Sequence, residues 1–126
     1  MQQNCCMLFF EVKFYYGESM KLKNTVRILM EEGNILEVPG EFFPYTYNGH
    51  NFKLIVHESV QPWTPNVLDI SEESTGCRCV STDKPVSSST KEDIKNAMDK
   101  FIQDKGLRNF QSQIKKRTKT LDLTRV

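Results

Sequence analysis

The N-terminal part of the chain alternates between hydrophobic and mixed positions with a period of two. Leu8, Phe10, Val12, Phe14 and Tyr16 would share one face of an extended segment. This period, together with the aromatic side chains, is typical of a β-strand. We therefore expect the first strand of a sheet at residues 8–16.

The segment from Lys21 to Glu32 is compatible with two structures. Its apolar residues would gather on one face of a helix, but Val26, Ile28 and Met30 would also alternate along a strand. The apolar segment 35–38 follows at the distance expected of a hairpin. This spacing favours the strand slightly, and the pattern alone leaves both structures open.

Asn48-Gly49 is the clearest local signal in the chain. This dipeptide favours the two left-handed positions of a type I′ turn, which joins antiparallel strands and here pairs Tyr47 with His50. Pro44 cannot donate a hydrogen bond to a neighbouring strand, so we expect its strand at an edge of the sheet. The turn also sorts the apolar residues onto one face, which carries Phe43, Tyr45, Tyr47, Phe52, Leu54 and Val56.

Two shorter strands are expected further along the chain. Residues 67–71 and 77–81 are separated by the turn sequence Ser74-Thr75-Gly76. The stiff loop before them, Pro62-Trp63-Thr64-Pro65, carries the single tryptophan of the chain. These strands would extend the antiparallel sheet.

A helix is predicted from Ser89 to Lys105. Ser89 and Glu92 have the spacing of a capping box, and Gly106 stands where a left-handed residue would end the helix. Its apolar residues recur at the intervals of one helical face, and a thinner stripe continues for about two turns beyond the glycine. The first stripe consists of Ile94, Ala97, Met98, Phe101 and Ile102, and the second of Leu107, Phe110 and Ile114.

These patterns predict an α+β fold in a single domain. We expect a mainly antiparallel sheet of about five strands, with the amphipathic helix packed on one face and a short basic helix after it. Residues 1–106 would form the core domain, and residues 107–126 the basic C-terminal helix and tail. A chain of 126 residues suits one such domain.

Composition narrows the class of protein. The chain is 38% hydrophobic and 26% charged, close to the average of globular proteins. No apolar run reaches the length of a membrane span, and no segment has the pattern of a secretory signal. We therefore expect a cytoplasmic protein with no membrane partner.

Charge is distributed unevenly along the chain. The net charge is +1, but residues 1–104 have a balance of −5 and residues 105–126 a balance of +6, from seven basic and one acidic side chains. A split of this kind indicates either a polyanionic partner or an internal clasp between the two segments.

The cysteines and histidines do not form a recognisable reactive motif. The four cysteines occur as Cys5-Cys6 and as Cys77 and Cys79, and neither spacing suits a zinc knuckle or a secreted disulfide framework. His50 and His57 lie near the Asn48-Gly49 hairpin, without a nucleophile motif or a phosphate-binding glycine loop around them. We expect a protein that is not an enzyme and that holds no metal or cofactor.

The basic segment is the leading candidate for function. Lysine and arginine side chains along a helix can neutralise phosphates and release their counterions. We therefore predict a non-enzymatic binding module that contacts nucleic acid, while a solvated helix end or a clasp against the acidic body would explain the same charges. The candidate nucleic-acid-binding residues are Arg108, Lys115, Lys116, Arg117 and Lys119.

A protein partner is the alternative function. Trp63, held between two prolines, would be a suitable anchor in a protein interface, although the same residue could pack over the edge of the core. On this hypothesis the chain is an accessory or inhibitor protein of a phage or other mobile element. The sequence leaves the partner and the oligomeric state open.

Overall fold

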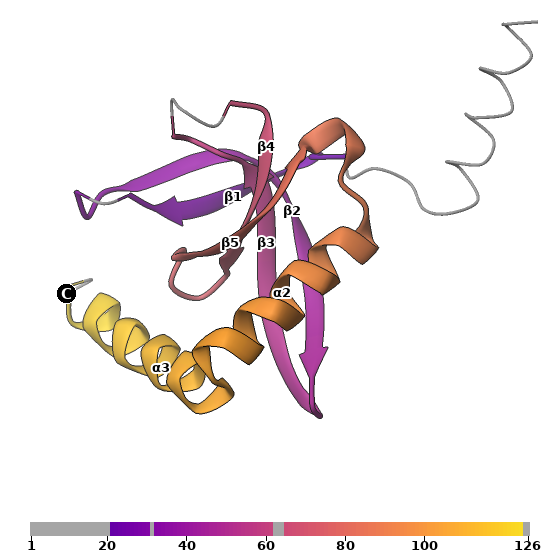
Figure 1. Cartoon of the computed structure of the whole chain (residues 1–126). Coiled ribbons are helices and arrows are strands. Elements are labelled where there is room, and N and C mark those ends of the chain that lie inside the picture. The colour runs from indigo at the N-terminus through magenta and orange to yellow at the C-terminus, as the bar shows by residue number, and fades with distance from the viewer. Residues whose placement is uncertain (1–20, 31, 62–64, 125–126) are drawn as a thin grey trace, which may run out of the picture.

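The computed structural model describes residues 21–30, 32–61 and 65–124, with side chains described as far as residue 118. These residues form a five-stranded antiparallel sheet in which every strand pairs with the next one along the chain, and two α-helices follow the sheet (Figure 1). The predicted α+β fold is therefore confirmed, while the strand expected at residues 8–16 lies outside the described residues. The elements are β1 (Asn24–Leu29), β2 (Ile35–Tyr47), β3 (His50–Glu58), β4 (Val67–Glu72), β5 (Arg78–Pro85), the 3-10 helix η1 (Val86–Ser88), α2 (Lys91–Lys105) and α3 (Leu107–Thr124).

The ambiguous segment after Lys21 forms a strand. β1 pairs with the first half of β2, from Asn24 opposite Gly40 to Leu29 opposite Ile35. Val26 and Ile28 are buried while Thr25 and Arg27 are exposed, which is the period-two burial of a strand with one covered face. The slight preference for a strand at this position is confirmed.

The hairpin at Asn48-Gly49 has the predicted register. Both turn residues have positive φ angles, 50° and 80°, and Tyr47 pairs with His50. Pro44 was expected in an edge strand, but β2 lies between β1 and β3. Because β1 pairs only as far as Gly40, Pro44 lies in the half of β2 that has β3 as its single neighbour. The missing N–H donor is therefore tolerated there.

The sheet buries apolar side chains on both faces. One face packs against the helices. The sheet bends towards its other face, where Val26 and Ile28 of β1 pack against Ile55 of β3. Figure 1 shows β1 and the start of β2 lying across the other strands. Gly40 permits this approach, because a Cβ atom at that position would lie 2.5 Å from Cγ2 of Val26. The backbone N–H of Leu29 also donates to the carbonyl oxygen of Gly76 at 2.8 Å, which ties the end of β1 to the β4–β5 turn.

α2 packs on one face of the sheet through the predicted apolar stripe. Ile94, Met98 and Ile102 are almost fully buried. The Tyr45 hydroxyl of β2 donates to Oδ1 of Asp99 at 2.6 Å and links sheet to helix on the same side. Burial and the adjacent carboxylate raise the pKa of Tyr45, so the phenol keeps this proton.

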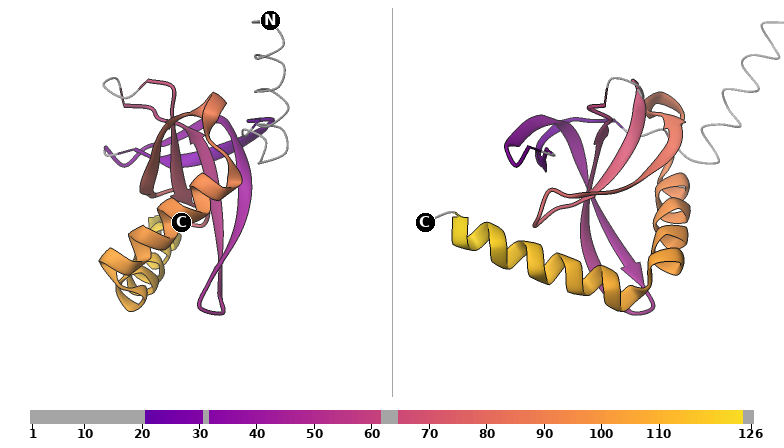
Figure 2. Two further views of the ribbon diagram at one scale, coloured as in Figure 1. Left: turned by 45° about the vertical axis from the view of Figure 1, so that its right-hand side comes forward. Right: turned by 60° about the vertical axis from the view of Figure 1, so that its left-hand side comes forward.

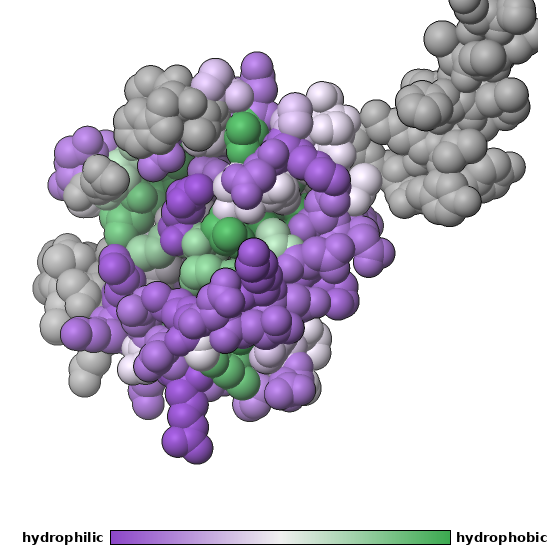
Figure 3. Space-filling view, viewed as in Figure 1, coloured by the Kyte–Doolittle hydropathy of each residue, from purple (hydrophilic) through white to green (hydrophobic). Residues whose placement is uncertain are grey.

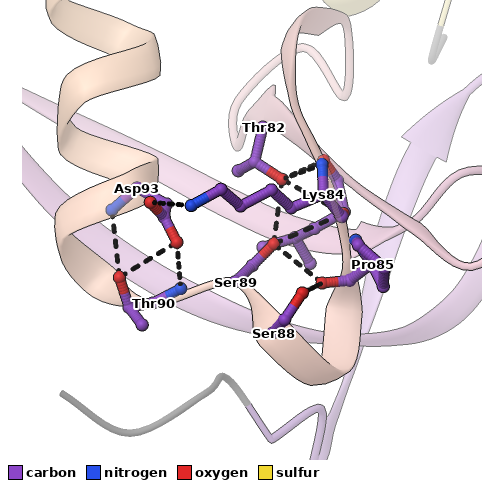
Figure 4. Close-up of polar contacts among 8 residues, drawn as sticks. Thr82, Lys84, Pro85, Ser88, Ser89, Thr90 and Asp93 are labelled. Atoms are coloured by element: carbon purple, nitrogen blue, oxygen red, sulfur yellow. Dashed lines mark hydrogen bonds and ion pairs between the residues drawn. The ribbon is translucent and has the colours of Figure 1, made fainter. Parts of the chain in front are cut away.

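The N-cap of α2 differs by one residue from the prediction. Thr90 is the N-cap: its Oγ1 accepts from the Asp93 N–H at 3.2 Å, and Oδ2 of Asp93 accepts from the Thr90 N–H at 2.9 Å (Figure 4). The capping box expected from Ser89 and Glu92 is therefore wrong. Ser89 is instead fully buried, and its hydroxyl donates to the Pro85 carbonyl oxygen at 2.9 Å, which fixes the connection from β5.

α3 is longer than the short helix that the sequence predicts, because it continues to Thr124. It leaves α2 at Gly106 and runs beneath the strands, so that the two helices form a corner around the sheet (Figure 2). Phe110 is 4% exposed and joins the main core, with its ring centroid 5.1 Å from that of Phe52 and 5.4 Å from that of Phe101. The thinner apolar stripe thus holds the second helix on the sheet.

The observed capping box generates a stability prediction. Thr90→Ala removes the hydroxyl that accepts from the Asp93 N–H, and we expect it to lower the free energy of unfolding by about 1 kcal/mol. Ser87→Ala, at an exposed position of η1, is the control and should leave stability unchanged. Urea denaturation measures both variants. Equal midpoints for wild type and Thr90→Ala would contradict the assignment of the cap.

Candidate nucleic-acid interface

The rotation of α3 about its own axis decides which cations face solvent. Each residue advances an α-helix by about 100°, so Arg108 and Lys115 lie roughly opposite the buried Phe110. Both side chains are exposed, as is Lys116. In Figure 3 the surface over α2 and along the lower edge of the molecule, where α3 lies, is mostly hydrophilic. The helix therefore presents a cationic side away from the core.

Polar contacts hold α3 at two places besides the Phe110 anchor. Nε2 of Gln111 lies 3.3 Å from Nδ1 of His50 at the β2–β3 hairpin. Further along the helix, the hydroxyl oxygen of Thr118 lies 3.4 Å from that of Ser74 in the β4–β5 turn. These contacts join α3 to two hairpin connections of the sheet and fix which face of the helix points outward.

The five cations predicted to bind nucleic acid do not all lie on the same side of α3. Arg108, Lys115 and Lys116 are exposed on the outer part of the helix. Arg117 is also exposed, but it is two turns from Phe110 and therefore on the side of the helix nearer the sheet, where its Nη1 donates to Sγ of Cys77 at 3.6 Å. The backbone of Lys119 continues α3, but its side chain lies outside the described residues, as does Trp63.

Two of the outward cations, Arg108 and Lys115, are not paired with the acidic residues that the structure describes. The ion pairs among described side chains are Arg27–Glu37, Arg78–Asp69, Lys84–Asp93 and Lys95–Asp99. Neither Arg108 nor Lys115 forms an ion pair with another described residue. Their charge is therefore directed at solvent, which an internal clasp would not produce.

The cysteines of β5 and its preceding loop have the properties of small apolar residues. Cys77 and Cys79 are free cysteines, and both are half-buried. Burial, with the nearby Glu72 carboxylate, raises the pKa of the Cys79 thiol to about 12, so it stays protonated at neutral pH. Among the described residues, no group of three or more potential ligands is placed to hold a metal ion. Cys5 and Cys6 lie outside them.

The sheet brings together a buried polar pair that the sequence pattern did not indicate. Nδ1 of His57 lies 3.0 Å from the carbonyl oxygen of Glu58, so this nitrogen carries the proton and donates. Nε2 then accepts from the Ser71 hydroxyl at 2.9 Å. This donor order resembles that of an activated serine, but His57 is only 2% and Ser71 1% exposed. We assign the pair to the interior of the sheet.

A buried carboxylate lies beside that pair. Asp69 is opposite His57 in the β3–β4 ladder, and its Oδ2 lies 3.0 Å from Nε of Arg78. Its second oxygen, Oδ1, is buried and has no hydrogen-bond partner among the described residues. The ion pair fixes the position of Arg78, and sequence reasoning missed it because the two residues belong to different strands.

The chain matches no protein-family model, no curated protein and no solved structure. By its fold and its residues, the protein is thus a small α+β domain with a cationic helix. Among the described residues, no helix combines the length and apolar character needed to cross a membrane.

The buried histidine generates a prediction of pH-dependent stability. Burial lowers the pKa of His57 in the folded chain, despite the opposing hydrogen bond to Glu58 and the negative charge of Asp69. Below the unfolded pKa of about 6.5, the unfolded chain binds a proton that the folded chain excludes. We expect the free energy of unfolding to have its full value at about pH 7.5 and to fall as the pH decreases through about 6.5 to about 5.5.

Urea denaturation across this range tests the effect. His57→Gln should flatten the decline, even if it lowers stability at every pH. The matched control is His50→Gln, which removes the exposed histidine of the hairpin turn. If the two substitutions alter the pH dependence equally, burial of His57 is not its cause.

Proposed function

We propose that this protein is a non-enzymatic cytoplasmic binding module that contacts nucleic acid through the outward face of α3. The observation that carries the proposal is the pair Arg108 and Lys115, exposed on a helix that Phe110 anchors to the core and without an ion pair among the described residues. The free thiols of Cys77 and Cys79 are compatible with a reducing compartment.

The dimensions of α3 suit a phosphate backbone. From Arg108 to Lys119 the helix rises about 16 Å, which corresponds to about five nucleotides of one strand in a duplex. Contacts from lysine and arginine to phosphates position a protein on nucleic acid without reading its sequence. We therefore infer electrostatic binding with little dependence on base sequence, using Arg108, Lys115, Lys116 and Lys119 as the main contacts.

A second candidate function, binding of a protein partner, has an observation of its own. Phe42 of β2 is 48% exposed and Leu36 is 37% exposed, and both lie on the face of the sheet opposite the helices. Exposed apolar side chains on such a face are suited to a protein interface. An accessory or inhibitor protein would bind its target there, with Trp63 as a further contact.

Fluorescence anisotropy with labelled oligonucleotides tests the nucleic-acid proposal. About four phosphate contacts should give roughly a hundredfold loss of affinity between 50 and 200 mM salt. Arg108→Glu combined with Lys115→Glu should weaken binding at 50 mM salt at least ~10-fold and reduce the salt dependence by about two contacts.

The control carries the same charge change at another place. Lys91→Glu combined with Lys100→Glu alters two exposed lysines of α2 and should leave binding close to that of wild type. Circular dichroism checks that each variant is folded. Equal weakening by both pairs would mean that net charge, not the α3 face, governs binding. Absence of binding by the wild type at 50 mM salt would overturn the proposal.

The protein-partner candidate has a separate experiment. Affinity capture from cell lysate with wild type and with Phe42→Ser, at the same protein concentration, should recover a partner that the variant loses. Thr46→Ser, at an exposed position of the same strand, is the control. Identical recovery with all three proteins would remove this candidate surface.

A further inference from the structure

A cavity of about 560 Å³ lies where α2 and α3 meet the β4–β5 turn and the end of β1. Figure 1 and the right-hand view of Figure 2 show the β4–β5 turn above α3, with β1 above the turn. Three of the residues that line the cavity are cations, and they come from three different elements: Arg78 of β5, Lys105 of α2 and Arg117 of α3. The volume is within the range of small-ligand sites in proteins.

The cavity has an excess of positive charge. Among the described residues that line it, the one carboxylate belongs to Glu72, which is 6% exposed. Both oxygens of that carboxylate already accept hydrogen bonds from the following turn, at 3.0 Å from each of the N–H groups of Ser74 and Thr75 and at 2.8 Å from their hydroxyls. Glu72 therefore stabilises the turn. Lys105 and Arg117 form no ion pair with a described residue, whereas Arg78 is paired with Asp69.

Each cation is held in place by a neighbouring group. Asp69 binds Arg78 through Nε, so the two Nη nitrogens can still donate to another acceptor. Arg117 is directed inward by its contact with Cys77, and Nζ of Lys105 lies 5.7 Å from the centre of the Phe101 ring. A ligand anion would thus meet positioned donors, including two guanidinium groups, whose geometry suits phosphate.

Much of the remaining wall of the cavity is apolar, although Thr75 and Gln113 also line it. Leu29, Met30, Phe101, Phe110 and Ile114 contribute to it. A ligand that contacts both the cations and the apolar residues of the cavity must carry an anionic group attached to a flat or apolar moiety. A nucleoside phosphate has this chemistry, because its base can lie against apolar and aromatic side chains while its phosphate meets arginine and lysine.

We propose that this cavity binds one nucleoside phosphate unit. The inference rests on the proposed function, since Arg117 of α3, the helix proposed to contact nucleic acid, also lines the cavity. The bases of a duplex are paired and stacked, and only an unpaired nucleotide can enter. The cavity therefore gives the protein a preference for single-stranded over double-stranded nucleic acid.

The first arm of the test uses free ligands and the intact protein. Adenosine 5′-monophosphate should shift the NMR amide signals of residues around the cavity, whereas adenosine alone should not shift them. Lys105→Gln combined with Arg117→Gln should weaken this binding at least ~10-fold, since each lost cation removes a phosphate contact. Lys91→Gln combined with Lys100→Gln, two exposed lysines of α2 that do not line the cavity, is the control, and it should bind the nucleotide as wild type does.

The second arm uses single-stranded and duplex 12-mers of one sequence in anisotropy titrations. Wild type should favour the single strand, and Lys105→Gln combined with Arg117→Gln should lose that preference. The four cations that the two double variants replace are on the surface of the helices or at their ends. Circular dichroism with thermal melting checks that both double variants fold. A variant that fails to fold is replaced by Arg117→Gln alone.

The outcomes separate the two proposals. If wild type shows no shifts with adenosine 5′-monophosphate, or if the cavity variant keeps wild-type nucleotide affinity, the inference is overturned. Oligonucleotide binding with an unchanged strand preference in the cavity variant would also overturn it, while the proposed function would stand. Nucleotide binding without any oligonucleotide binding would remove the proposed function and support the cavity as a site for free nucleotides.

Discussion

Burial of Phe110 is the contact on which the arrangement of the C-terminal half depends. Its ring packs between those of Phe52 and Phe101 and thereby joins α3, β3 and α2. Because a helix is rigid about its axis, burying this one residue determines the direction of every other side chain of α3. Arg108 and Lys115 consequently face solvent, whereas Arg117 faces the β4–β5 turn. The outer cationic face and the inner cavity are two results of the same apolar contact.

Local signals in the sequence were sufficient for much of the fold. Asn48-Gly49 requires two left-handed residues and fixes the register of β2 and β3 without reference to the rest of the chain. The cap of α2 was misplaced because Ser89 and Thr90 are both good N-cap residues, and each has an acidic residue three positions later. Only the burial of Ser89 against Pro85 decides between them, and that contact depends on the path of the preceding strand.

The sequence predicted only the part of the candidate site that lies on a single helix, α3. The cations of α3 are close in sequence, so composition identified them, but the pattern did not show that Arg117 points away from Lys115. The cavity cannot be read from sequence, because Arg78 and Lys105 come from separate elements. Likewise, Asp69 and Arg78 meet across the β4–β5 ladder, and no spacing in the chain indicates that contact.

The corner between the two helices consists of a single residue. Gly106 has a φ of 96°, and its N–H closes α2 on the Ile102 carbonyl while its own carbonyl accepts from Phe110. Any residue with a Cβ atom is disfavoured at this angle, and without the break the two helices would merge into a rod of about 50 Å. Such a rod would carry Phe110 away from Phe52 and Phe101, and the sheet would lose its contact with the second helix. One backbone torsion therefore decides whether α3 packs on the sheet of its own chain.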